Sequence, residues 1–330
     1  MVSVVWVVSV VPVAMIAFVF PGQGAQKVGM GQSLARASDV CRDTFAEADA
    51  ALGEPLSELC FAGPEDRLML TENTQPAILA MSVAVCRLVT AEGVTPSFAA
   101  GHSLGEYSAH VAAGTLSFAD ALRTVRRRGR YMQDAVPIGE GAMAAILGLD
   151  APVVDAVCAE VRSESGRIVT PANLNAPGQV VIAGHADAVA RAGERTKARG
   201  AKRVIPLAVS APFHCPLMKP AEERLAPELR TLPASDPRIP VVANVDAEPK
   251  RTAAAAIDAL IAQIASPVRW EDVVRRLVRE GTRTFVELGP GTVLAGLIKK
   301  IDRGVTVLSI EDENGLRSAM PQLTAADDTR

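Results

Sequence analysis

The chain has 330 residues, of which 49% are hydrophobic and 22% charged, and its formal net charge at pH 7 is −3. This hydrophobicity excludes a disordered protein, and the small net charge with only 4% aromatic residues argues against a nucleic-acid-binding protein. At about 150 residues per domain, the length predicts two domains, or one large domain that carries an insert.

Residues 1–20 carry no charge and are largely apolar. A membrane helix needs about 20 apolar residues, but Pro12 interrupts the run, and the positive segment that opens a signal peptide is missing. We expect residues 16–20 to form a buried strand. Residues 1–14 are interpreted as an extra N-terminal segment. Three alternatives stay open for it, in order of preference: an artefact of the assigned start site before Met15, an added strand, or a membrane anchor. No membrane association is expected.

Strand and helix patterns alternate over the first part of the chain. After the glycine-rich loop PGQGAQKVGMG, helices are expected over 31–52, 74–90 and 119–135, with a short apolar strand at 97–100. Strands that alternate with helices of this length predict a parallel sheet covered by helices on both faces.

The pattern changes after the third helix. Residues 139–207 predict strand, helix, strand, strand, helix and strand, which is the split βαβ order of a ferredoxin-like module. We expect this module to be inserted into an α/β-hydrolase-like core formed by residues 15–138 and 208–315, with a further strand at 282–288. Residues 316–330 are expected to form a polar tail.

The cysteines and histidines give no support for a metal site or a disulfide framework. The five cysteines are widely spaced and contain no C-x-x-C pair, and the four histidines form no H-E-x-x-H motif. We therefore expect reduced thiols, no bound metal and a cytoplasmic location.

The most informative motif is Gly101-His102-Ser103-Leu104-Gly105, a G-x-S-x-G between a predicted strand and a predicted helix. This setting predicts a nucleophile elbow, because the glycines let the chain turn tightly and leave the hydroxyl of Ser103 clear of the backbone. The N-terminus of the following helix directs N–H groups and partial positive charge to the same place. The N–H of Leu104 is thus a natural donor to an oxyanion.

A serine hydroxyl is a poor nucleophile unless a base takes its proton. We expect His214 to be that base, because it lies in the proline-bracketed loop SAPFHCPLM and catalytic residues concentrate on such loops. His102 should point away from its neighbour Ser103. His110 is expected on a helix in the core or at the surface, and His185 at the end of a strand in the insert.

No acidic residue between Ser103 and His214 follows a clear core strand, which is where a hydrolase of this type places its acid. The group that orients the histidine is therefore expected to be a neutral acceptor. Asn244 and Gln263 are the candidates.

Five arginines lie between positions 123 and 130, and a helical segment of that length spans more than one face. At least one of them should point toward the sheet. A buried guanidinium needs an anionic partner, and a substrate carboxylate held by two hydrogen bonds is the attractive candidate.

Six segments then stand out in order along the chain. They are FPGQGAQ (20–26), GHSLGEYSAHVAAG (101–114), RRRGRYMQDAV (126–136), NAPGQVVIAG (175–184), APFHCPLM (211–218) and ELGPG (287–291). Together they resemble the malonyl-CoA:acyl carrier protein transacylases of fatty-acid and polyketide synthesis, over residues 15–310. The resemblance implies an α/β-hydrolase-like core with a ferredoxin-like insert. It also implies a monomeric enzyme that moves a malonyl group from malonyl-CoA to the phosphopantetheine thiol of acyl carrier protein, without a metal or redox cofactor.

The resemblance implies the roles of the catalytic residues. Ser103 would carry the acyl group as an ester, and His214 would be its base. Gln23 would supply a second oxyanion N–H beside that of Leu104. Gln263 matches the position whose backbone or side-chain oxygen orients the histidine.

It likewise implies the substrate contacts. Arg128 matches the carboxylate-binding arginine of the family, and Met132 in the same segment is expected to contact the substrate. Phe213 is a bulky aromatic residue at a position that goes with selection of malonyl over methylmalonyl groups, since an α-methyl group would meet its ring. Exposed arginines of 123–130 and the pair Lys299-Lys300 are candidates for docking an acidic carrier protein.

Three other functions stay open on the sequence. One is a trans-acting polyketide acyltransferase with another acyl preference, and the second is a serine thioesterase or hydrolase on the same core. The third is a docking subunit without catalytic activity.

Overall fold

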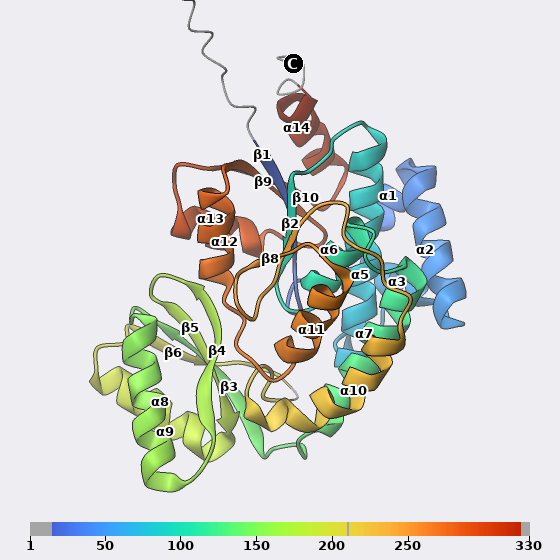
Figure 1. Ribbon diagram of the computed structural model, residues 1–330. Helices are drawn as coiled ribbons and strands as arrows, with labels where there is room; N and C mark the ends of the chain where they lie inside the picture. Colours follow the sequence, from blue (N-terminus) through green and yellow to red (C-terminus); the bar gives the residue numbers. More distant parts are fainter. Residues whose placement is uncertain (1–14, 210, 325–330) are drawn as a thin grey trace, which may run out of the picture.

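The computed structural model describes residues 15–209 and 211–324 (Figure 1). Within these residues the larger sheet has six strands in the order β10-β9-β1-β2-β7-β8, and neighbouring strands are parallel except for β7 and β8. The strands are β1 (Met15–Phe20), β2 (Phe98–Gly101), β7 (Val241–Val242), β8 (Pro249–Lys250), β9 (Thr282–Leu288) and β10 (Thr306–Ile310). The predicted α/β fold with a parallel-sheet core is thus confirmed.

Side chains of β1 alternate between the hydrophobic layers on the two faces of this sheet, because successive residues of a strand point to opposite sides. Phe18 and Phe20 belong to one layer, and Ala17 and Val19 to the other. The second layer includes α12 (Trp270–Arg279) and α13 (Val293–Ile301). The first includes α1 (Gln32–Ala37), α2 (Asp39–Leu52), α3 (Leu56–Ala62), α4 (Glu65–Leu68), α5 (Thr71–Ala91), α6 (Gly105–Ala112), α7 (Phe118–Asp134), α10 (Lys219–Thr231), α11 (Ala253–Gln263) and α14 (Glu313–Thr324).

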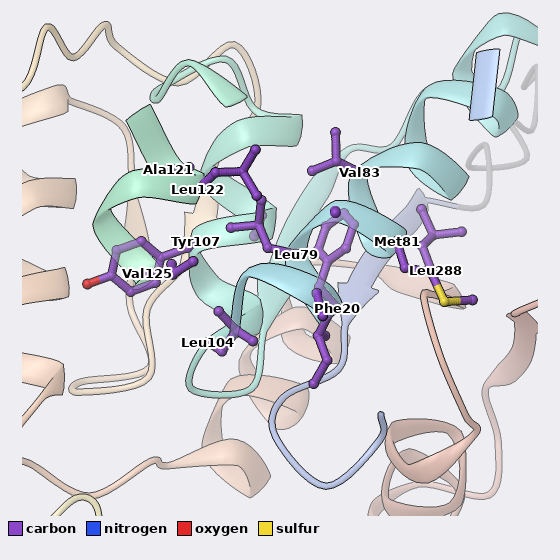
Figure 2. Packing of buried hydrophobic residues seen from close by; sticks show 14 of the residues in the cluster. Phe20, Leu79, Met81, Val83, Leu104, Tyr107, Ala121, Leu122, Val125 and Leu288 are labelled. Atoms are coloured by element: carbon purple, nitrogen blue, oxygen red, sulfur yellow. The ribbon is translucent and has the colours of Figure 1, made fainter. Parts of the chain in front are cut away.

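Helix α5 forms the centre of the first layer. Figure 2 shows Leu79 and Val83 of α5 packed among side chains of β1, α6 and α7, including Phe20, Tyr107 and Leu122. Among the described residues, α5 is the one helix long and apolar enough to cross a membrane, and 83% of its most apolar window is buried inside the protein. Its position in the core accounts for its composition.

A second, antiparallel sheet of four strands lies beside the first in the described chain, in the order β4-β5-β3-β6 (Figure 1). Its helices α8 and α9 pack on one hydrophobic cluster with β3, β4 and β5. The chain order is strand, helix, strand, strand, helix, strand, the split βαβ order. The elements are β3 (Gly141–Leu147), α8 (Ala151–Ser165), β4 (Val169–Ala176), β5 (Gln179–His185), α9 (Ala186–Ala198) and β6 (Arg203–Pro206). The domain limits given above stay predictions.

The C-terminal region differs from the expected polar tail over 316–330. Helix α14 runs through its first part to Thr324, and Ala319 and Leu323 are buried against the core. These apolar residues are four positions apart and so share one helix face, whereas Arg317, Ser318 and Gln322 are exposed and give the segment its polar appearance. Residues 325–330, and the N-terminal segment 1–14 with its alternatives, lie outside the described residues.

Candidate active site

The G-x-S-x-G motif forms the tight turn between β2 and α6. Ser103 has a φ of 52°, in the left-handed region that residues other than glycine rarely adopt. A Cβ at Gly101 would overlap the backbone of Gly105, and a Cβ at Gly105 would overlap the backbone oxygen of Phe20 on β1. Only glycine fits at both positions, so the turn that presents Ser103 is dictated by this short sequence.

Asn244, which lies just after β7, holds this turn in place. Its Oδ1 accepts a hydrogen bond from the backbone N–H of Ser103 at 2.7 Å, and its Nδ2 donates to the backbone oxygen of Gly101 at 2.7 Å. The side chain is fully buried. Asn244 was one of two candidates for orienting the histidine. The structure instead places its side chain against the turn that carries the nucleophile.

His214 meets Ser103 across 111 residues of sequence, with Nε2 at 2.6 Å from the serine Oγ. On its other side, Nδ1 lies 3.0 Å from the backbone oxygen of Gln263. A carbonyl oxygen can only accept, so Nδ1 carries the proton and Nε2 is left with a lone pair toward the serine. The geometry thus assigns the tautomer that a base requires.

The electrostatic surroundings keep this imidazole neutral. Burial lowers the pKa of His214 to about 3, and the positive charge of Arg128 acts in the same direction. A neutral imidazole at neutral pH is free to take the proton of Ser103.

Arg128 is buried beside the nucleophile, with only 1% of its surface exposed. Its Nη2 donates to Oγ of Ser103 at 3.1 Å and to Oε1 of Gln263 at 2.9 Å, and its Nη1 donates to Oε1 of Gln75 at 2.8 Å. The guanidinium carbon also lies 5.5 Å from the centre of the Tyr107 ring. These partners are neutral, so the positive charge is held in place without being neutralised.

The neighbouring arginines on α7 behave differently. Arg123, Arg126, Arg127 and Arg130 each form a salt bridge with a carboxylate. Within residues 15–209 and 211–324, Arg128 forms none. One guanidinium of the five is therefore left to receive an anionic ligand.

A cavity of about 250 Å³ opens over Ser103, between the two sheets. Gln23 and Leu104 line it near the nucleophile, and Met132 and Phe213 line its wall. The smaller sheet contributes further residues, which are Met143, Asn173, Asn175, Gln179 and Val181. The structure thus brings every predicted site residue to this cavity or, for Gln263, directly behind it.

The remaining histidines make contacts away from the serine. His102 lies against Asn175 of the smaller sheet, with Nε2 at 2.9 Å from the amide oxygen. His110 is fully buried, which lowers its pKa to about 3, and His185 accepts a hydrogen bond from the backbone of Ile168.

Sequence reasoning missed Gln75 and Glu106. Both are buried, with 2% and 0% of their surface exposed. Their neighbours in the sequence, TENT before Gln75 and YSAH after Glu106, are themselves largely polar, so the local pattern marked neither residue as buried. Gln75 binds Arg128, and Glu106 binds Gln263.

The five cysteines are unpaired and buried. Burial raises the pKa values of Cys60, Cys86, Cys158 and Cys215 to about 12. Within the described ranges, no group of three or more histidine, cysteine, aspartate or glutamate residues could hold a metal ion. Independence from cofactors stays a prediction.

Comparison with known proteins identifies the family. Residues 17–314 match the acyl transferase domain family. The chain is 49% identical over 313 residues to the malonyl CoA-acyl carrier protein transacylase of Bacillus subtilis, which covers 95% of this chain and 98% of the relative. The corresponding protein of Escherichia coli K12 is 48% identical over 305 residues, or 92% of this chain and 98% of the relative. The chain belongs to the malonyl CoA-acyl carrier protein transacylase family.

Solved structures of this transacylase family superpose closely on the chain. One is a malonyl-transacylase in complex with its type II PKS acyl-carrier protein, with a TM-score of 0.91 and 48% identity over 94% of this chain and 100% of that one. The transacylase of Coxiella burnetii gives a TM-score of 0.91 at 43% identity, over 94% and 98% of the two chains. The family resemblance expected from the six segments is thus confirmed.

Proposed function

We propose that the protein transfers the malonyl group of malonyl-CoA to the phosphopantetheine thiol of acyl carrier protein, through an ester on Ser103. The supporting observation is the arrangement around one hydroxyl, with His214 Nε2 at 2.6 Å and Arg128 Nη2 at 3.1 Å. A nucleophile, a base and a buried cation without an ion-pair partner suit an acyl substrate with a distal carboxylate. The relative that was solved with its acyl-carrier protein supports the choice of acceptor.

The first half-reaction acylates the serine. Oγ of Ser103 attacks the thioester carbonyl, and its proton passes to Nε2 of His214. The carbon–sulfur bond then breaks, and the same proton passes to the thiolate, so coenzyme A leaves as a thiol. The Gln263 oxygen holds the imidazole ring through Nδ1. We assign the backbone N–H groups of Gln23 and Leu104 to the oxyanion.

The second half-reaction reverses these steps with a different thiol. The phosphopantetheine thiol of the carrier protein gives its proton to His214 and attacks the ester carbonyl. The carbon–oxygen bond breaks, and Ser103 regains the proton from Nε2. Because the acceptor thiol enters after coenzyme A has left, the kinetics are of the ping-pong type.

Arg128 would select the acyl group. In the free protein its Nη2 donates to Oγ of Ser103. The carboxylate of a bound malonyl group is a stronger acceptor and would take over that donor, which also releases the hydroxyl for His214. Met132 and Phe213 would bound the space beside the acyl chain, and the ring of Phe213 would disfavour an α-methyl group.

Intact-mass measurement after mixing with malonyl-CoA tests the proposal. We expect the mass of one malonyl group on the native chain and its removal by holo acyl carrier protein. Ser103→Ala should gain no mass, whereas a chain with Ser108→Ala, which replaces a buried serine on α6, should react as the native chain does. Absence of the adduct would disprove acyl transfer through Ser103, and loss of the adduct to water as fast as to the carrier protein would indicate a hydrolase.

A further inference from the structure

Glu106 is a fully buried carboxyl group in the first turn of α6, and no step of the mechanism above uses it. Its Oε2 accepts a hydrogen bond from the backbone N–H of Asn244 at 2.9 Å and another from Nε2 of Gln263 at 2.7 Å. In the described part of the chain, its Oε1 has no hydrogen-bond partner and no cation forms a salt bridge with it. Glu106 does not line the cavity, so it lies behind the site rather than in it.

The stability of the fold does not explain this carboxyl group. Arg128 is the charge that favours the ionised form of Glu106, but it forms no salt bridge with it. A buried carboxyl group without a direct salt bridge, and with one oxygen unpaired, costs free energy that a hydrocarbon side chain of similar size would avoid. Its contacts to Gln263 and Asn244 are therefore the place to look for a role.

The contact with Gln263 fixes which way that side-chain amide points. Glu106 offers an acceptor oxygen, so the NH₂ end of Gln263 must face it, and the same Nε2 also donates to the backbone oxygen of Ser103 at 3.0 Å. The oxygen end is thereby turned to Arg128, which can only donate and does so at 2.9 Å. Reversing the amide would set donor against donor at Arg128.

This orientation does not depend on whether Glu106 is ionised. Burial raises the pKa of Glu106 to about 7, so both forms are populated at neutral pH. Oε2 faces two N–H donors and accepts in either form, and the proton of the neutral form has its place on Oε1.

We propose that Glu106 is a positioning residue for the carboxylate-binding group of Arg128, acting through the side-chain amide of Gln263. The amide holds Nη2 of Arg128 beside Ser103, where the far end of a dicarboxylic acyl group would be bound. This inference rests on the proposed function and deepens it. It assigns part of the discrimination between malonyl and uncharged acyl groups to a residue that does not touch the substrate.

The test measures the rates at which malonyl-CoA and acetyl-CoA acylate Ser103, and compares their ratio among variants. Glu106→Leu keeps the volume but removes the acceptor, and we expect it to lower the ratio on the order of ten- to a hundredfold. Glu106→Gln still offers Oε1 to both donors, so its ratio should stay within about threefold of the native value. Ser108→Ala is the matched control for a buried polar residue on α6, and its ratio should be native.

A double-mutant cycle shows whether the effect passes through Arg128. In an Arg128→Ala background, Glu106→Leu should not change the ratio further, since the group that it positions is gone. An equal loss of malonyl and acetyl rates in a Glu106→Leu protein of native thermal stability would overturn the proposal. A ratio that still falls in the Arg128→Ala background would overturn it as well.

Gln263→Met tests the same connection from its other end, and it decides the matter if Glu106→Leu does not fold. Methionine has a similar length but no amide, and the backbone oxygen that binds His214 remains. The ratio should fall as in Glu106→Leu, and a native ratio would overturn the proposal. Failure of the proposed function looks different, because the native chain itself would then gain no malonyl group.

Discussion

Two strand-to-helix connections of the larger sheet, β2 to α6 and β9 to α13, each have a buried glutamate beside them, and the two glutamates make different contacts. After β2, Glu106 binds Gln263 and Asn244 with one oxygen, while the other oxygen stays unpaired. Near the end of β9, Glu287 uses both oxygens, which accept hydrogen bonds from the backbone N–H groups of Leu294 and Ala295 at 3.0 and 2.8 Å. Burial raises the pKa of each to about 7.

The same chemical group can therefore serve stability at one site and function at another, depending on which donors surround it. Glu287 accepts from two backbone N–H groups at the start of α13 that have no partner within the helix, as a helix cap does, and the helix dipole favours a negative charge there. Glu106 leaves part of its own hydrogen-bonding capacity unused and instead orders side chains behind the nucleophile. We therefore expect the Glu287 turn to respond mainly in stability, and the Glu106 turn mainly in acyl selection.

The largest effect should come from Gly105→Ala in the first turn. The added Cβ would overlap the backbone oxygen of Phe20, and a backbone oxygen in a central strand cannot move aside. We expect the free energy of unfolding to fall by more than about 4 kcal/mol, with loss of Ser103 acylation. Urea unfolding and intact-mass acylation measure the two effects, and a native-like Gly105→Ala protein would contradict the described turn.

Glu287→Ala should give the next largest effect. It leaves two N–H groups at the start of α13 without acceptors and opens a small cavity, so the free energy of unfolding should fall by about 3 kcal/mol. The ratio of malonyl to acetyl acylation should stay close to native. Urea unfolding beside the acylation assay checks both, and a change in the ratio larger than that in Glu106→Leu would reverse the comparison.

The free energy of unfolding should depend on pH through the carboxyl groups of Glu106 and Glu287. A carboxyl group whose folded-state pKa is raised stabilises the fold fully below its unfolded pKa, and this contribution is lost as the pH rises through the folded value. Between about pH 4.5 and pH 7 the free energy of unfolding should therefore fall, on the order of 2 kcal/mol for each group. Chemical unfolding of Glu106→Gln and Glu287→Gln across this range should give a shallower slope than the native chain, and unchanged slopes would refute the raised pKa values.

Gly291→Ala in the second turn should have the smallest effect. Gly291 has a φ of 76°, but the nearest atom to an added Cβ, the Cβ of Ala25, would be 3.7 Å away. The cost is therefore that of a left-handed alanine, about 1 kcal/mol. Thermal unfolding measures it, and a loss as large as that of Gly105→Ala would show that the two turns are equally tight.

The sequence allowed prediction of those parts of the site that depend on local pattern. The elbow follows from two glycines around Ser103, and the helix that holds Arg128 follows from its periodicity. The choice of Arg128 among its neighbours came only from the family resemblance. Arg126 is buried as well, and which arginine faces Ser103 depends on how α7 packs on α5 and the sheet.

The connections behind the nucleophile could not be predicted in this way. Glu106 meets Gln263 across 157 positions, and Asn244 meets Ser103 across 141. Contacts between such distant residues depend on the order of strands in the sheet and on the position of α11, and neither can be predicted from a short segment of sequence. Helix α14 was missed for a simpler reason, since exposed polar residues such as Arg317, Ser318 and Gln322 lie close to its two buried residues in the sequence.

The burial of the thiols has a consequence for a protein that handles thioesters. Activated acyl groups react readily with accessible thiolates, and an exposed cysteine near the entrance would capture them by exchange. Cys215 follows His214 directly, yet it is fully buried and its Sγ donates to the backbone oxygen of Pro212 at 3.1 Å. Because the five thiols are buried and protonated, a thioester substrate does not acylate them. The acyl group is therefore transferred to the hydroxyl of Ser103.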